Sequence, residues 1–240
     1  MIFHDRETID ELRDYDLRIV QQRDGYRFSI DPLLLCDFVA AGEGMRVIDL
    51  GTGCGIIPLV LARKYGGVRV VGVEMQEEMS GIAERNVRLN GLCEKIEIIC
   101  ADILSLRRRY PVSHFDLVLA NPPYRRQGTG RISPRAGRDL ARHESSAGLV
   151  DFLETAKYLV KRAGSICFIY HTSRLGDCLA EAGRRNLNPV RLRFVHWSPE
   201  TDGRMFMVEM VKERKRDMVI LPPCFVSRPL DNLSYQEKDE

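Results

Sequence analysis

The feature that most constrains the fold of this chain is a regular alternation of short apolar segments with amphipathic segments. Runs of β-branched and other apolar residues predict strands at 45–50, 68–74, 95–100, 115–120, 164–170, 189–197 and 204–212. Apolar residues at helical spacing predict helices over 32–40, 56–65, 75–91, 146–162 and 173–186. Such alternation implies a mostly parallel sheet with helices on both faces. The last two strands have no helix between them and are expected to be antiparallel.

Composition limits the class of protein. With 240 residues, 44% hydrophobic and 29% charged, the chain is expected to form a single domain, residues 1–240, of ordinary globular composition. No apolar run approaches the ~18–20 residues that a membrane span needs, and the N-terminus is charged where a signal peptide would be apolar. The seven cysteines form no CxxC pair or zinc spacing, so we expect free thiols, a cytoplasmic location and no metal.

A glycine-rich turn, DLGTGCGI at 49–56, follows the strand predicted at 45–50. Glycines at 51, 53 and 55 let the backbone turn sharply and leave room for a ligand against the main chain. The spacing is not the G-x-G-x-x-G of dinucleotide sites, and the lysine of a phosphate loop is missing. Asp49 at the strand end suits a ligand with an ammonium group. A plain tight turn is the alternative interpretation.

Two further acids follow neighbouring strands. Glu74 ends the strand predicted at 68–74, where a carboxylate can accept hydrogen bonds from both hydroxyls of a ribose. Asp102 follows the strand predicted at 95–100, where it can accept from an adenine amino group. Because a doubly wound fold brings strand ends to one crevice, these groups describe a pocket for an adenosine joined to an amino acid, which is S-adenosylmethionine.

The segment NPPY, 121–124, ends the strand predicted at 115–120. Neither proline has a backbone N–H, so the sheet ladder cannot continue through them. Asn121 and Pro122 offer two carbonyl oxygens that can accept both hydrogens of an exocyclic amine. Tyr124 offers a face on which a flipped base can stack. A proline-rich turn that merely closes the strand is the alternative.

An arginine-rich segment follows this motif. Between 125 and 144 there are six arginines and two acids, whereas the net charge of the whole chain is only +2. Arginine favours fork-shaped contacts with phosphate. We expect Arg125, Arg126, Arg131 and Arg135 to bind RNA, and a solvated loop is the alternative.

These motifs resemble those of the class I methyltransferases. VIDLGTGCG, VGVE and AD match the cofactor motifs of that class, and NPPY matches the catalytic motif of its amino-methyltransferase group. The upstream segment QQRDGYRFSIDPLLLCDFV and the C-terminal NLSYQEKDE resemble one bacterial family, the tRNA adenine-N6 methyltransferases acting on valine tRNA. The resemblance covers nearly the whole chain.

The resemblance implies a Rossmann-like α/β fold with a seven-stranded, mostly parallel sheet and a C-terminal antiparallel pair. Residues 1–44 are expected to cap substrate and cofactor, and 45–240 to form the catalytic core. Asn121, Pro122 and Tyr124 are the expected catalytic residues. The residues expected to contact S-adenosylmethionine are Phe28, Asp49, Gly51, Thr52, Gly53, Cys54, Gly55, Glu74, Met75, Ala101, Asp102, Ile103 and Asn121.

The expected reaction is methylation of the N6 amine of an adenine in tRNA by a monomer with no obligate protein partner. A protein glutamine-N5 methyltransferase is the nearest alternative, but such enzymes usually carry a separate helical domain before the leading motif. A ribosomal RNA guanine-N2 methyltransferase is a further alternative, although that group's motif more often ends in phenylalanine. A non-enzymatic RNA chaperone that binds S-adenosylmethionine also remains open.

Overall fold

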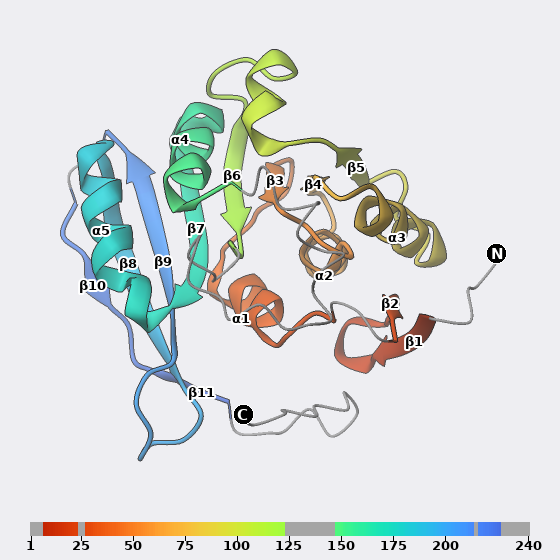
Figure 1. Ribbon diagram of the computed structural model, residues 1–240, viewed down its shortest axis with the longest axis horizontal. Coiled ribbons are helices and arrows are strands. Elements are labelled where there is room, and N and C mark those ends of the chain that lie inside the picture. The colour runs from red at the N-terminus through yellow and green to blue at the C-terminus, as the bar shows by residue number, and fades with distance from the viewer. Residues whose placement is uncertain (1–6, 24–26, 123–146, 214–215, 227–240) are drawn as a thin grey trace, which may run out of the picture.

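The computed structural model describes residues 7–23, 27–122, 147–213 and 216–226. Within these residues one nine-stranded sheet forms the centre of the molecule, and a separate two-stranded hairpin lies beside it (Figure 1). The order of strands across the sheet is β10-β8-β9-β7-β6-β3-β4-β5, and β11 pairs with β8. The strands of the sheet are β3 (Arg46–Leu50), β4 (Arg69–Glu74), β5 (Ile96–Cys100), β6 (Phe115–Ala120), β7 (Val160–His171), β8 (Leu187–His196), β9 (Met205–Lys212), β10 (Val219–Ile220) and β11 (Cys224–Phe225).

The directions of the strands confirm the predicted topology. Strands β3 to β7 pair only in parallel with one another, and β9 is antiparallel to both β7 and β8. The seven longer strands are those predicted from the sequence. The two others, β10 and β11, have two residues each and pair in parallel with β8.

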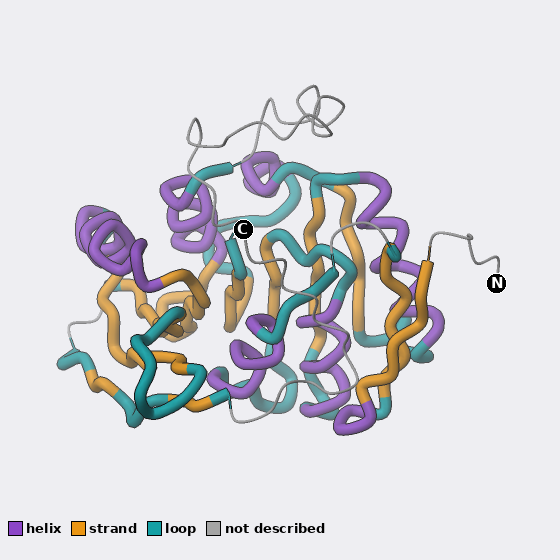
Figure 2. Tube along the Cα trace, turned by 60° about the horizontal axis from the view of Figure 1, so that its bottom comes forward, coloured by secondary structure: helices purple, strands orange, loops and turns teal. Residues whose placement is uncertain are grey.

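Helices cover the sheet on both faces, as Figure 2 shows by the helical segments on either side of the strands. Residues of α1 (Asp31–Phe38), α2 (Ile56–Lys64) and α3 (Glu77–Leu89) join one apolar cluster, in which Leu35, Leu59 and Leu61 are completely buried. Residues of α4 (Leu149–Leu159), α5 (Leu175–Arg184) and the short 3-10 helix η2 (Ile103–Arg108) join a second cluster on the other face. The apolar residues whose spacing predicts the helices are therefore those that pack against the two faces of the sheet.

The boundary between α4 and β7 differs from the prediction. The sequence pattern predicts a helix through residue 162, but the helix ends at Leu159 and the strand begins at once with Val160. Val160 pairs with Phe115 on β6, and both side chains are buried. Pairing with the neighbouring strand thus outweighs the local helical pattern at this point.

The N-terminal hairpin was not predicted. Strands β1 (Glu7–Leu12) and β2 (Leu17–Gln22) are antiparallel and are joined by the 3-10 turn η1 (Arg13–Tyr15). The hairpin lies beside α3 (Figure 1), and Arg85 on that helix forms a two-pronged ion pair with Glu7 on β1. Among the described residues, no helix combines the length and the apolar character that crossing a membrane requires.

Candidate functional site

The glycine turn after β3 has a backbone that only glycine adopts readily. Gly51, Gly53 and Gly55 have φ angles of +77°, +57° and +86°. The N–H groups of Gly51 and Thr52 both donate to the carbonyl of Val73 on β4, at 2.9 and 2.8 Å. The turn is therefore tied to the neighbouring strand while its outer edge remains open to a ligand.

Glu74, at the end of β4, holds the same turn through its side chain. One carboxylate oxygen accepts a hydrogen bond from the N–H of Gly53 at 3.0 Å, and the other accepts from the N–H of Gln76 at 2.9 Å. The side chain is 8% exposed. Each carboxylate oxygen has further lone pairs, so a ligand hydroxyl can be bound by a group whose direction is already set.

Asp49 is the most unusual polar residue of the site. Its side chain is completely buried, and among the described residues neither carboxylate oxygen has a hydrogen-bond partner of good geometry. Burial raises the pKa of Asp49 to about 7; the nearby Thr52 hydroxyl lowers it in part, and the charge of Glu74 raises it further. A buried carboxylate without a partner is costly, so this group is set to gain from a cationic ligand.

A small pocket opens beside the glycine turn. It brings together six of the residues predicted from the sequence, namely Phe28, Gly51, Thr52, Gly53, Cys54 and Asn121. Pro32, Ile56 and Ile57 also line it, although they were not predicted as site residues. Position alone could have indicated them, because Pro32 is the second residue of α1, the helix after Phe28, and the two isoleucines follow Gly55 directly.

The remaining predicted residues that the structure describes are not among those that line this pocket. Asp49, Gly55 and Glu74 are buried next to the turn. Met75 is 39% exposed, and one oxygen of Asp102 accepts from the N–H of Leu104 in the first turn of η2. Ala101 and Ile103 flank Asp102 at the end of β5.

Part of the predicted catalytic and RNA-binding set lies outside the described residues. Asn121 and Pro122 are described and follow β6, with Asn121 in the pocket wall and Pro122 buried. Tyr124 and the four arginines Arg125, Arg126, Arg131 and Arg135 fall in the range 123–146, which is outside the description.

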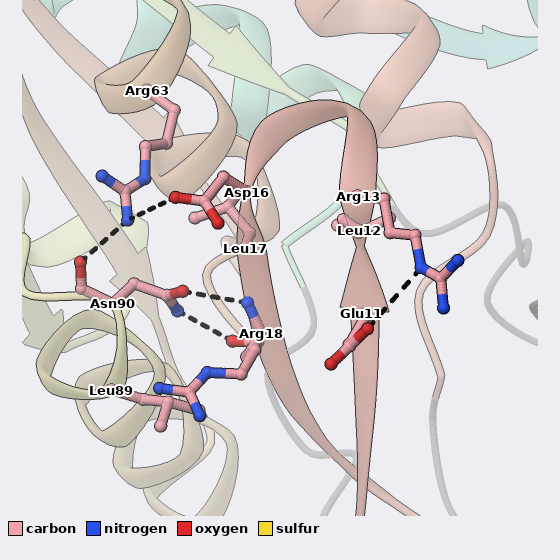
Figure 3. A pocket seen from close by; sticks show the side chains of 9 residues that line it. All are labelled: Glu11, Leu12, Arg13, Asp16, Leu17, Arg18, Arg63, Leu89 and Asn90. Carbon is pink, nitrogen blue, oxygen red and sulfur yellow. Dashed lines mark hydrogen bonds and ion pairs between the residues drawn. The ribbon is translucent and has the colours of Figure 1, made fainter.

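A second hollow, of about 360 Å³, lies by the tip of the hairpin, away from the glycine turn (Figure 3). Its walls are polar, and their groups already bind one another. The side-chain amide of Asn90 bonds both the N–H and the carbonyl of Arg18, at 2.9 and 2.8 Å. Arg63 donates to the carbonyl of Asn90 at 3.2 Å. This hollow therefore lies where the hairpin docks on α2 and α3. None of the described residues that line it has a buried polar side-chain atom without a hydrogen-bond partner.

The residues around the glycine turn fit S-adenosylmethionine. The buried carboxylate of Asp49 lacks the cationic partner that an α-ammonium group would provide. Glu74 carries acceptors suited to a ribose, and the turn has no side chain at three positions where a ligand would approach the backbone. Among the described residues no group of three histidines, cysteines or acids could hold a metal ion.

Comparisons with known proteins agree with this chemistry. Residues 30–147 match the family model of the methyltransferase small domain. The structure of a predicted O-methyltransferase from Agrobacterium tumefaciens superposes with a TM-score of 0.66 at 22% identity, covering 82% of this chain and 88% of that one. A ribosomal protein L11 methylase from Lactobacillus delbrueckii superposes with a TM-score of 0.55 at 16% identity, over 76% and 77% of the two chains. These likenesses confirm the class I methyltransferase fold.

Curated relatives are more similar in sequence. The tRNA1(Val) (adenine(37)-N6)-methyltransferase of Tolumonas auensis is 31% identical over 63% of this chain, and the match spans 62% of that relative's length. The enzyme of the same name from Porphyromonas gingivalis is 30% identical over 71% of this chain and 67% of its own length. The chain therefore belongs to the methyltransferase family of these relatives.

Proposed function

We propose that this protein transfers a methyl group from S-adenosylmethionine to the exocyclic N6 amine of an adenine in tRNA. The observation that carries the proposal is the position of Asn121, which follows β6 and lines one pocket with the glycine turn. Methylation of an amino group requires that a hydrogen-bond acceptor for the amine and the turn that binds the cofactor lie in the same pocket. The names of the two curated relatives support tRNA as the substrate.

The cofactor would be held by three strand ends. Asp49 would pair with the ammonium group, Glu74 with the ribose hydroxyls, and Asp102 with the adenine amine. When bound there, the cofactor supplies an electrophilic methyl group. Phe28, which is 4% exposed and lines the pocket, would limit access of water to it.

The chain's own contribution to the reaction is to orient a weak nucleophile. The lone pair of an adenine amino group is spread into the ring. The side-chain oxygen of Asn121 and the backbone carbonyl of Pro122 would accept its two hydrogens and favour a pyramidal nitrogen. Because the prolines restrict the backbone before the substrate arrives, little reorganisation is left for the transition state. The methylated ammonium loses its proton readily, so no general base is required before transfer.

The test is methyl transfer from radiolabelled S-adenosylmethionine to three substrates offered separately. These are unmodified valine tRNA, a ribosomal RNA fragment and a peptide release factor. We expect label in the tRNA alone, recovered as N6-methyladenosine by mass spectrometry of nucleosides, and Asn121→Ala as the matched control should abolish most of it. Label in the release factor or as N2-methylguanosine would establish one of the alternatives instead. Cofactor binding without transfer to any of the three would contradict the proposed reaction.

A further inference from the structure

The N-terminal hairpin contacts the pocket through two buried amides that the chemistry above does not use. Asn86 on α3 is completely buried and makes three side-chain hydrogen bonds. Its oxygen accepts from the N–H of Val20 on β2 at 2.7 Å, and its nitrogen donates to the carbonyl of Val20 at 3.0 Å. The same nitrogen donates to the carbonyl of Cys54 in the glycine turn at 2.9 Å. One side chain therefore joins the hairpin to the pocket wall.

The orientation of the Asn86 amide follows from its partners. The nitrogen faces two carbonyl oxygens, which only a donor can satisfy, and the oxygen faces an N–H. The helix that carries Asn86 also packs closely against the turn. If Gly55 carried a side chain, its Cβ would lie only 3.2 Å from the Cβ of Ala83 on this helix. The turn is thus packed against α3 at Gly55 and hydrogen-bonded to it at Cys54.

The second amide is Gln21, the residue after Val20 on β2. Its side chain is 1% exposed, and its oxygen accepts from the backbone N–H of Phe28 at 2.9 Å. Its nitrogen donates to Asp10 on β1 at 2.5 Å, and the guanidinium of Arg27 contacts the same carboxylate. Phe28 lines the same pocket as the glycine turn. Two successive residues of β2 are therefore linked to residues that line this pocket, Val20 to Cys54 through Asn86 and Gln21 directly to Phe28.

We propose that the hairpin is part of the cofactor pocket, with Asn86 and Gln21 as positioning residues that set Cys54 and Phe28 at binding distance. The identity of the ligand rests on the function proposed above. In the folded protein the glycine turn has few side chains of its own to restrain it, so its geometry depends on Glu74 from one side and Asn86 from the other. Loss of either amide would leave Cys54 or Phe28 less restrained, and the pocket would bind the cofactor with lower affinity.

The chain offers a matched control for each amide. Asn90, one turn after Asn86, binds the N–H and carbonyl of Arg18 in the same two-pronged way, but its third bond goes to the carbonyl of Asn86 and not to the glycine turn. Gln22 follows Gln21 on β2, but its side chain donates to Glu78 on the surface. Asn90→Ala and Gln22→Ala therefore weaken hairpin docking without touching the pocket.

The experiment compares Asn86→Ala with Asn90→Ala, and Gln21→Met with Gln22→Ala. Calorimetry with S-adenosylhomocysteine should give a Kd raised by about five- to tenfold for Asn86→Ala and Gln21→Met, as loss of the one hydrogen bond that each side chain makes to a pocket residue predicts. The two controls should stay within about twofold of wild type by the same measure. Steady-state assays should show the rise in KM for S-adenosylmethionine and not in KM for tRNA.

A second measurement does not need the ligand. Hydrogen exchange of the Gly53 amide, which reports opening of the turn, should accelerate by about five- to tenfold in Asn86→Ala and not in Asn90→Ala. If wild type binds no S-adenosylhomocysteine, the proposed function fails, while this exchange comparison still decides the role of Asn86. Equal acceleration in both variants, or none in either, would overturn the inference, and Gln21→Met tests the other wall should Asn86→Ala not fold.

Discussion

The carboxylate of Glu74 and the backbone N–H of Gly53 are joined by a hydrogen bond of 3.0 Å that links the ends of two neighbouring parallel strands. The same carboxylate accepts from the N–H of Gln76 at 2.9 Å, so its plane is fixed from both sides. A group that is oriented in this way can bind a ligand hydroxyl without first losing rotational freedom.

Replacing Glu74 by alanine should weaken binding of S-adenosylmethionine by about 1.5–3 kcal/mol, the range for hydrogen bonds to a charged group. The variant loses the proposed ribose acceptor and also one restraint on the glycine turn. Isothermal calorimetry measures the affinity, and Glu77→Ala removes an exposed acid nearby on α3 as a control. Equal affinities for wild type and Glu74→Ala would exclude the ribose assignment.

Replacing Asp49 by asparagine should change how stability depends on pH. The pKa of Asp49 is raised to about 7 in the folded protein by burial, whereas an ordinary aspartate has a pKa of 3.8. Between these values the folded state holds more protons than the unfolded state, so this group's contribution to stability falls as pH rises from about 4 through 7. Relative to Asp49→Asn, wild type should lose about 2 kcal/mol of unfolding free energy between pH 5.5 and 8.

Urea unfolding of both proteins at the two pH values measures this difference, and contributions of other groups cancel in the comparison. Parallel profiles would show that the carboxylate of Asp49 has an ordinary pKa. In wild type, affinity for S-adenosylmethionine should also rise as pH rises through about 7, because binding an ammonium group requires the ionised acid. Asp49→Asn should bind weakly at every pH.

Replacing Asn121 by alanine should lower turnover by about 10²- to 10³-fold, as loss of one preorganised contact to developing charge does. Affinity for the cofactor should change much less, since the amide is expected to face the target amine. Asn121→Asp keeps an acceptor oxygen and should retain more activity than the alanine variant. Single-turnover methylation of tRNA measures both, and near-normal turnover in Asn121→Ala would exclude the proposed mechanism.

Replacing Arg125, Arg126, Arg131 and Arg135 together by alanine should weaken tRNA binding and flatten its salt dependence. Each arginine that meets a phosphate should reduce the slope of log affinity against log salt by about 0.7–0.9. Filter binding across a salt series measures the slope. The double variant of Arg107 and Arg108, which are exposed on η2, controls for general loss of positive charge. Superimposable lines for wild type and the quadruple variant would move the RNA surface elsewhere.

Much of the fold was predictable because its signals are local. The strands from β3 to β9 are apolar runs bounded by turn residues, and α1, α2, α3 and α5 carry apolar residues at helical spacing. The convergence of Asp49, Glu74 and Asn121 at one edge was also predictable, because parallel strands end at the same side of a sheet. The positive φ angles at Gly51, Gly53 and Gly55 follow from glycine's freedom to adopt them.

The N-terminal hairpin could not be predicted in the same way. Its first strand, β1, is rich in charged residues, and the groups that hold the hairpin come from far along the chain. Asn86 binds Val20 across 66 residues, and Asn90 binds Arg18 across 72. Local periodicity contains no information about partners so far apart in the chain, so the docking of the hairpin on α3 could not be predicted from it.

What the sequence determined by itself is the order of strands and helices, the glycine turn and the identity of the acids at the strand ends, because each depends on neighbouring residues in the chain. What the tertiary structure decided is the state of those groups. Asp49 acquires its raised pKa only because the packed fold removes its carboxylate from water. Cys54 and Phe28 line one pocket, and their backbone groups are hydrogen-bonded to Asn86, which also binds Val20 on β2, and to Gln21 of the same strand. Burial and long-range hydrogen bonding are properties of the folded chain, and no short segment of the sequence contains them.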